Sequence, residues 1–203
     1  MHAVIFDIDG TLLQSALVDD DLYRYSVESV VGPVHFRPSL ADYDFVTDSG
    51  ILSQVLEDNS LTVDPDPTPA IKACFIKALR DYIREQGPFC EVPGARSLVA
   101  SLCASRNHSV AIATGGWRES AHLKLDSARF DIENIPIVTS DDEYDRSEIM
   151  LTALSKLGSD FESITYYGDG PWDEDACLAL NWRFVAVGAA LGGLVSYSDI
   201  GVT

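Results

Sequence analysis

The second half of the chain alternates short apolar runs with segments of helical periodicity. Ile149, Met150 and Ala153 recur at helical spacing, and Gly158 follows them as a stop signal. The short runs are rich in Val, Ile and aromatic residues and predict strands over 109–114, 135–139, 163–168 and 183–187. Together with an apolar strand at the start of the chain, this pattern predicts an α/β fold with a doubly wound parallel sheet of five strands.

The long segment between the first two strands is helical in pattern. Apolar positions predict helices over 19–31 and 48–58. A longer helix is expected to begin with Thr68 as N-cap and Pro69 at its first position, and to end at Gly87. The segment therefore predicts an α-helical insertion that follows the first strand directly.

This insertion divides the chain into two expected domains. The α/β core comprises residues 1–14 and 89–203, and the helical cap comprises residues 15–88. Because the cap follows the first strand, we expect it to lie over the end of that strand like a lid.

Composition narrows the class of protein and its partners. A chain of 203 residues with 46% hydrophobic residues is long enough for a buried core plus a small accessory module. We expect a cytoplasmic protein, because no apolar stretch is long enough for a membrane span and the N-terminus lacks signal-peptide features. The four cysteines are scattered and indicate neither a zinc site nor a disulfide framework. The formal net charge of -18 argues against nucleic acid or an anionic membrane as partner.

Two carboxylates follow the first strand, in the string Asp7-Ile8-Asp9-Gly10-Thr11. Alternation along a strand directs Asp7 and Asp9 to the same side, and Gly10 allows a sharp turn after them. Two like charges held so close favour a hard divalent cation, and such a metal helps to bind phosphate. A solvated turn at the end of an ordinary strand is the simpler alternative.

Two further strand ends carry polar groups where an open parallel sheet binds ligands. Thr114, Gly115 and Gly116 offer a hydroxyl and two backbone amides, which suit a phosphate, although such a string alone is often only a loop. Asp169 and Asp173 add two carboxylates after the fourth strand. Asp173 is also compatible with capping the helix that begins near Trp172.

These motifs resemble those of the haloacid dehalogenase superfamily. Asp7-x-Asp9-Gly10-Thr11 is similar to motif one, Thr114 to motif two, and Gly168-Asp169-x-x-x-Asp173 to motif four. The resemblance covers nearly the whole chain and implies a Rossmann-like core. A helical insertion after motif one resembles the first cap type, that of phosphoglycolate phosphatase and β-phosphoglucomutase.

One motif departs from the usual pattern of the superfamily. Motif three commonly supplies a lysine, whereas the matching place in this chain holds Arg146. A guanidinium is permanently charged and can bind two phosphate oxygens, so it is compatible with the same electrostatic role. The simpler alternative for Arg146 is a surface cation in an acidic stretch.

The resemblance implies a Mg²⁺-dependent phosphoric monoester hydrolase acting on a small phosphorylated metabolite. Asp7 would be the nucleophile that forms an aspartyl-phosphate, and Asp9 the general acid and base. The resemblance places the metal on Asp7, the backbone carbonyl of Asp9 and Asp169, with Asp173 orienting the metal shell. The groups implied to hold the phosphate are Thr114, Gly115, Gly116 and Arg146.

Two alternatives remain open from the sequence. Asp9 separates this chain from dehalogenases and transport ATPases of the superfamily, but a sugar phosphomutase uses the same core residues. A non-catalytic protein that binds phosphate or a partner is the second alternative. The sequence also leaves open which cap residue faces the substrate, among Tyr23, Tyr43, Phe45, Asp48 and Lys77.

Overall fold

The five predicted strands form one parallel sheet in the computed structural model, which describes residues 1–61, 64–198 and 200. The strand order is β3-β2-β1-β4-β5, so β1 is the central strand. The edge strand β3 is shorter than predicted, because only two of its residues pair with β2. The strands are β1 (His2–Phe6), β2 (His108–Ala113), β3 (Ile137–Val138), β4 (Ser163–Gly168) and β5 (Arg183–Ala186).

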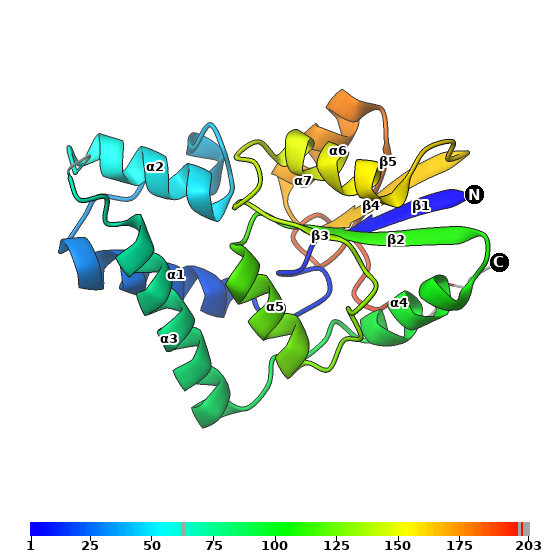
Figure 1. Cartoon of the computed structure of the whole chain (residues 1–203), viewed down its shortest axis with the longest axis horizontal. Coiled ribbons are helices and arrows are strands. Elements are labelled where there is room, and N and C mark those ends of the chain that lie inside the picture. The colour runs from blue at the N-terminus through cyan, green and yellow to red at the C-terminus, as the bar shows by residue number, and fades with distance from the viewer. Residues whose placement is uncertain (62–63, 199, 201–203) are drawn as a thin grey trace.

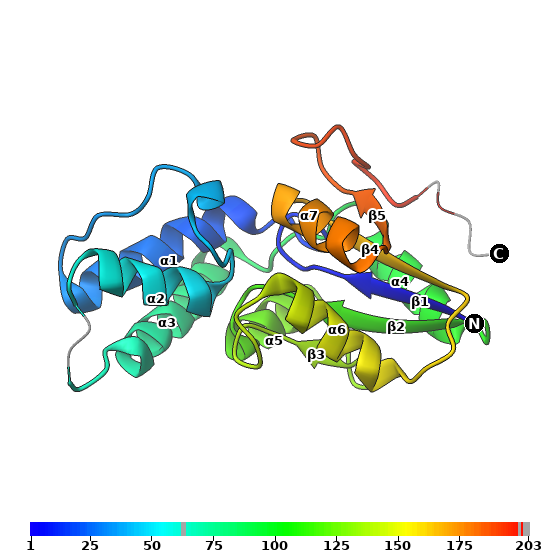
Figure 2. The ribbon, with the colours of Figure 1, turned by 90° about the horizontal axis from the view of Figure 1, so that it is seen from above.

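Helices cover both faces of the sheet, as Figures 1 and 2 show. Val4 and Phe6 of β1 pack with the face that carries α4 (Ala95–Ala104) and α5 (Arg118–Ser127). Ile5, on the opposite side of the strand, packs with α6 (Arg146–Leu157) and α7 (Pro171–Leu180). A strand buried on both faces explains the continuous apolar run at the start of the chain. The predicted doubly wound α/β fold is therefore confirmed.

The insertion between β1 and β2 is helical, as predicted, and lies beyond one end of the sheet (Figure 1). Within the described residues, none of the helices combines the length and the apolar character needed to cross a membrane. The insertion contains α1 (Ala16–Val31), the short 3-10 helix η1 (Leu40–Asp42), α2 (Asp48–Asp58) and α3 (Thr68–Gln86).

Two helix starts differ from prediction. Helix α1 begins at Ala16, three residues earlier than expected, and the Ser15 hydroxyl does not cap it but donates to Asp9. Thr68 is the first residue of α3 rather than its cap. Pro67 is the N-cap, and the carboxylate of Asp66 before it accepts from both the amide and the hydroxyl of Thr68, at 3.0 and 2.7 Å.

The two chain segments that connect core and insertion run side by side. The amide of Gln14 donates to the carbonyl of Cys90, and the amide of Val92 donates to the carbonyl of Leu12, both at 2.9 Å. This pairing places the outgoing and returning chain together near the expected domain boundary.

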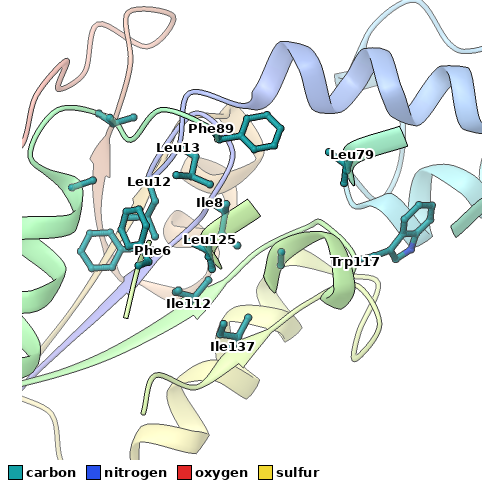
Figure 3. Close-up of a cluster of buried hydrophobic side chains, with 14 of the residues drawn as sticks. Phe6, Ile8, Leu12, Leu13, Leu79, Phe89, Ile112, Trp117, Leu125 and Ile137 are labelled. Atoms are coloured by element: carbon teal, nitrogen blue, oxygen red, sulfur yellow. The ribbon is translucent and has the colours of Figure 1, made fainter. Parts of the chain in front are cut away.

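Core and cap share one hydrophobic cluster, part of which is drawn in Figure 3. Trp117, at the start of α5, is 2% exposed and lies against two cap side chains. Its ring centroid is 5.4 Å from that of Tyr23 and 5.6 Å from that of Phe75. The cap is therefore packed against the core at the carboxyl ends of the strands.

Candidate active site

Three aspartates converge at the carboxyl ends of β1 and β4. Asp7 follows β1, Asp169 follows β4, and Asp173 lies in the first turn of α7. One carboxylate oxygen from each lies within 4.8 Å of the other two. Such a group of buried oxygen donors is a candidate site for a hard divalent cation.

Burial and mutual repulsion make the carboxylates of this cluster hard to ionise. Burial raises the pKa of Asp7 well above its usual value, and although Arg146 opposes this, the charges of Asp173 and Asp169 add to it. Burial and the charges of Asp173 and Asp9 raise the pKa of Asp169 to about 7. Carboxylates that are costly to ionise together are stabilised by a bound cation. The donor set therefore fits Mg²⁺, with Asp7, Asp169 and Asp173 as the side chains that would hold it.

Asp173 also caps α7. Its carboxylate accepts from the amide of Gly170 at 3.2 Å and from the hydroxyl of Tyr166 at 3.4 Å, and its side chain is fully buried. Asp173 therefore caps the helix and lies in the acidic cluster at the same time, a combination that the sequence allowed.

Arg146 lies inside the site rather than on the surface. It is the first residue of α6, whose N-cap Asp145 accepts from the amides of Ser147 and Glu148. Its Nη1 is 3.4 Å from Oδ1 of Asp7, and its Nε is 3.3 Å from Oδ1 of Asp173. The alternative of a surface cation is wrong, since only 10% of the side chain is exposed.

Neighbouring acidic groups stabilise the positive charge of Arg146. Burial lowers its pKa, but the neighbouring Asp173, Tyr166 and Asp7 raise it by more. Its Nε is buried and makes no hydrogen bond among the described residues, although it lies within ion-pair distance of Asp173, at 3.3 Å. A permanently charged guanidinium beside Asp7 is suited to an anionic ligand.

The loop after β2 contributes to the same cleft. Thr114 is 1% exposed, and the amide of Gly116 donates to its hydroxyl oxygen at 3.3 Å. At Gly115 a Cβ atom would lie 2.8 Å from Nη2 of Arg146, so a side chain there would displace the guanidinium. Thr114, Gly115 and Gly116 thus lie with Arg146, and the smallness of Gly115 is required by that contact.

These groups line a cleft of about 170 Å³ between core and cap. The core contributes all of the predicted site residues except Asp173, namely Asp7, Asp9, Thr114, Gly115, Gly116, Arg146 and Asp169. From the cap come Tyr23 and Asp48, whereas Tyr43, Phe45 and Lys77 are not among the lining residues.

The loop at the start of α2 joins cap to core beside the cleft. The amide of Asp48 donates to the carbonyl of Gly115 at 2.8 Å, and the carboxylate of Asp48 accepts from the amide of Trp117 at 2.9 Å. The indole of Trp117 donates to the hydroxyl of Ser49 at 2.9 Å. This cap segment is therefore hydrogen-bonded to the loop that follows β2.

One charged residue of the site escaped prediction. Lys124 on α5 is fully buried, and its ammonium contacts the carboxylates of Asp9 and Asp19. Its position in the helix could have revealed it. Lys124 follows Ala121 by three residues, and both lie on the buried face of α5. A lysine on an apolar helical stripe indicates a buried ion pair, and this one involves Asp9.

Solved structures share the fold over almost the whole chain. A hydrolase from Pseudomonas syringae is 23% identical, with a TM-score of 0.71, 92% of this chain covered and 84% of the other. CbbY from Rhodobacter sphaeroides in complex with phosphate is 16% identical, with a TM-score of 0.71 and coverages of 98% and 89%. A β-phosphoglucomutase from Clostridium difficile is 17% identical, with a TM-score of 0.70 and coverages of 93% and 85%. At such identities the likeness establishes a common fold.

The family is shown by a match to the sequence itself. No curated protein matches this chain. A family model of haloacid dehalogenase-like hydrolases matches residues 1–181, which includes the strand ends that carry Asp7, Thr114 and Asp169. The chain therefore belongs to the haloacid dehalogenase-like hydrolases.

Proposed function

We propose that this protein is a Mg²⁺-dependent phosphoric monoester hydrolase that acts on a small phosphorylated metabolite. The observation that carries the proposal is the position of Asp7. It lies at the end of the central strand, beside Arg146 and the carboxylates of Asp169 and Asp173, in a cleft that the cap covers. An anionic nucleophile next to a cation and a candidate metal site is suited to attack on phosphorus.

The first step is phosphoryl transfer to Asp7. A carboxylate oxygen of Asp7 bonds to phosphorus while the bond to the ester oxygen breaks, and Asp9 donates a proton to that oxygen as it leaves. Arg146 binds the oxygens of the transferring group, and Thr114 and the Gly115 backbone lie beside it. A bound magnesium ion supplies the positive charge that lets an anionic nucleophile approach an anionic phosphate.

The second step restores the enzyme. Asp9, now ionised, takes a proton from a water molecule, and the resulting hydroxide displaces the carboxylate of Asp7 from phosphorus. Inorganic phosphate leaves and Asp7 is free again. The cap helps by limiting the space for water, since Tyr23 and Asp48 lie over the cleft.

A panel of small phosphate monoesters, assayed for phosphate release with Mg²⁺ and with a chelator, tests the proposal. We expect turnover that requires the metal and that falls by roughly 10³-fold or more in Asp7→Asn, because the nucleophile is lost. Asp126→Asn on the exposed side of α5 is the matched control and should retain activity. No turnover of any ester by the wild-type protein with Mg²⁺ present would overturn the proposal. Including α- and β-glucose 1-phosphates, with product identification, separates hydrolysis from mutase activity.

A further inference from the structure

The ammonium of Lys124 makes three short contacts and has no exposed surface. Its Nζ donates to Oδ1 and Oδ2 of Asp9 at 2.8 and 2.6 Å, and to Oδ1 of Asp19 at 2.6 Å. An ammonium has three donors, so these contacts use its full capacity. Each of its hydrogens therefore has an acceptor, and two of the three acceptors belong to Asp9.

This ion cluster joins three parts of the molecule. Asp9 follows the central strand, Lys124 lies on core helix α5, and Asp19 lies on cap helix α1. Burial of an ion cluster is a weak source of stability, because well-packed apolar side chains of similar size often stabilise a protein as well or better. The lysine therefore needs an explanation other than stability, and its contact with Asp9 supplies one.

The hydrogen bonds distinguish the two oxygens of Asp9. Oδ1 accepts from Ser15 Oγ at 2.5 Å as well as from Lys124, whereas Oδ2 accepts from Lys124. Asp9 lines the cleft, and 19% of its side chain is exposed. Since a carboxylate oxygen has two acceptor positions, Oδ2 keeps one for a group in the cleft.

We propose that Lys124 is a positioning residue for the acid and base chemistry of Asp9, and that Asp19 links this orientation to the cap. The inference rests on the proposed phosphatase function. Lys124 and Ser15 fix the rotation of the Asp9 carboxylate and assign Oδ2 as the atom that exchanges the proton. That proton passes to the ester oxygen when its bond to phosphorus breaks, and Oδ2 receives a proton from water in the second step.

The test compares leaving groups that differ in their need for a proton. An alkyl phosphate requires protonation of its leaving oxygen, whereas 4-nitrophenolate leaves as a stable anion. Rapid-quench measurement of phosphorylated protein isolates the first step for both esters. In Lys124→Met we expect the rate for the alkyl ester to fall about 100-fold and that for 4-nitrophenyl phosphate by less than about 10-fold, since general acid catalysis contributes about 10²–10⁴-fold. Lys156→Met, at an exposed position of α6, should change neither rate.

Lys124→Met leaves buried carboxylates without their partner and can fail to fold, so a second and milder variant is tested as well. Asp19→Asn keeps the shape of the side chain and leaves both Asp9 contacts of Lys124 in place. It should show the same preference for the better leaving group to a smaller degree. The rise in unfolding temperature caused by Mg²⁺ should be unchanged in both variants, because the carboxylates of Asp7, Asp169 and Asp173 are intact.

The outcomes separate the two proposals. If the wild-type protein releases no phosphate from any ester of the panel with Mg²⁺ present, the proposed function fails. If the wild type is active and Lys124→Met lowers the rates for both esters by the same factor, or changes neither rate, the proposed function stands and the positioning role of Lys124 is overturned. Loss of the Mg²⁺ effect on unfolding in folded Lys124→Met would also overturn the positioning role, because it would show general disruption of the site.

Discussion

The α carbon of Gly10 lies so close to the carboxylate of Asp169 that a Cβ atom at residue 10 would overlap it. Gly10 also has a φ of 75°, in the left-handed region that side chains disfavour. The turn after Asp9 and the position of Asp169 are thus mutually dependent. The loop of motif one and the aspartate of motif four, which lie far apart in the sequence, can be this close only because residue 10 has no side chain.

Gly10→Ala should therefore damage the metal site as well as the turn. We expect a loss of stability of about 1–3 kcal/mol from the strained backbone, and a drop in Mg²⁺ affinity of roughly 10-fold or more, because Asp169 must move. Calorimetric titration with Mg²⁺ and thermal unfolding measure the two effects. Gly32→Ala is a matched control, since Gly32 has a φ of 84° and open space where a Cβ would lie. Equal Mg²⁺ affinity in both variants would contradict the close contact.

Arg146→Lys tests whether the commoner motif-three residue can replace the arginine. The guanidinium reaches Asp7, Asp173 and, through Nη2 at 3.5 Å, the carbonyl of Val46 on the cap. A single ammonium cannot make all three contacts. We expect KM to rise about 10-fold, and inhibition by inorganic phosphate to weaken about equally, because both anions lose a bidentate partner.

The matched control for this substitution is Arg80→Lys, at an exposed position where Arg80 pairs with Glu119. It should leave KM unchanged. An Arg146→Lys protein with the kinetics of the wild type would show that one positive charge, without the guanidinium geometry, is enough.

Two features of the molecule could be predicted from the sequence. Hydrophobic periodicity gave the order of strands and helices along the chain. The carboxyl ends of parallel strands meet at one edge of the sheet, which brings Asp7, Thr114 and Asp169 to one cleft, together with Arg146. Lys124 was missed because its role depends on Asp9 and Asp19, which lie 115 and 105 residues away in the sequence. No local pattern encodes that pairing.

Local competition explains the misjudged helix starts. The start of α1 at Ala16, before the predicted Asp19, has no side-chain cap, because the Ser15 hydroxyl donates to Asp9 in the site. Thr68 is a residue type that commonly caps helices, and only the backbone geometry shows that it is the first residue of α3, with Pro67 as the N-cap. Such boundaries depend on tertiary contacts and backbone geometry that the residue types alone do not specify.

Without metal, the acidic cluster should make the protein less stable as pH rises. The raised pKa of Asp169, about 7, means that the folded protein binds more protons than the unfolded chain between pH 3.8 and about 7. The free energy of unfolding therefore falls as pH rises through this window. Because one pKa unit corresponds to about 1.4 kcal/mol, the contribution is roughly 4 kcal/mol when the group is fully ionised.

Asp169→Asn removes this carboxylate and also relieves the repulsion that Asp169 exerts on Asp7, so both changes act in the same direction. Urea unfolding at pH 5 and pH 8 in chelator should show the variant gaining on the wild type at the higher pH. Mg²⁺ should stabilise the wild type at pH 8, by about 2.7 kcal/mol at 100 times its dissociation constant, and the variant much less. A wild-type protein that gains stability relative to Asp169→Asn from pH 5 to pH 8 in chelator would contradict the assignment.

The charges around the cleft predict selection against a second anion on the substrate. The carboxylates of Asp7, Asp9, Asp19, Asp20, Asp48 and Asp169 line it, together with Arg24 and Arg146. Arg24 pairs with Asp20 at 2.8 Å and lies over the Phe36 ring. Among the described lining residues, Arg146 is thus the cation left to bind phosphate, and a second negative group would meet carboxylates.

We expect ethyl phosphate or 2-aminoethyl phosphate to have a kcat/KM about 10-fold or more above that of phosphoglycolate, which carries a carboxylate of similar size. A factor of ten corresponds to about 1.4 kcal/mol, an ordinary cost for one close pair of like charges in a partly buried site. The ratio should shrink with added salt, because screening weakens the repulsion. Asp20→Asn releases Arg24 from its ion pair and should raise the relative rate for phosphoglycolate. If phosphoglycolate is turned over as fast as ethyl phosphate at low ionic strength, the carboxylates of the cap do not select the leaving group, and specificity must come from the shape of the cleft.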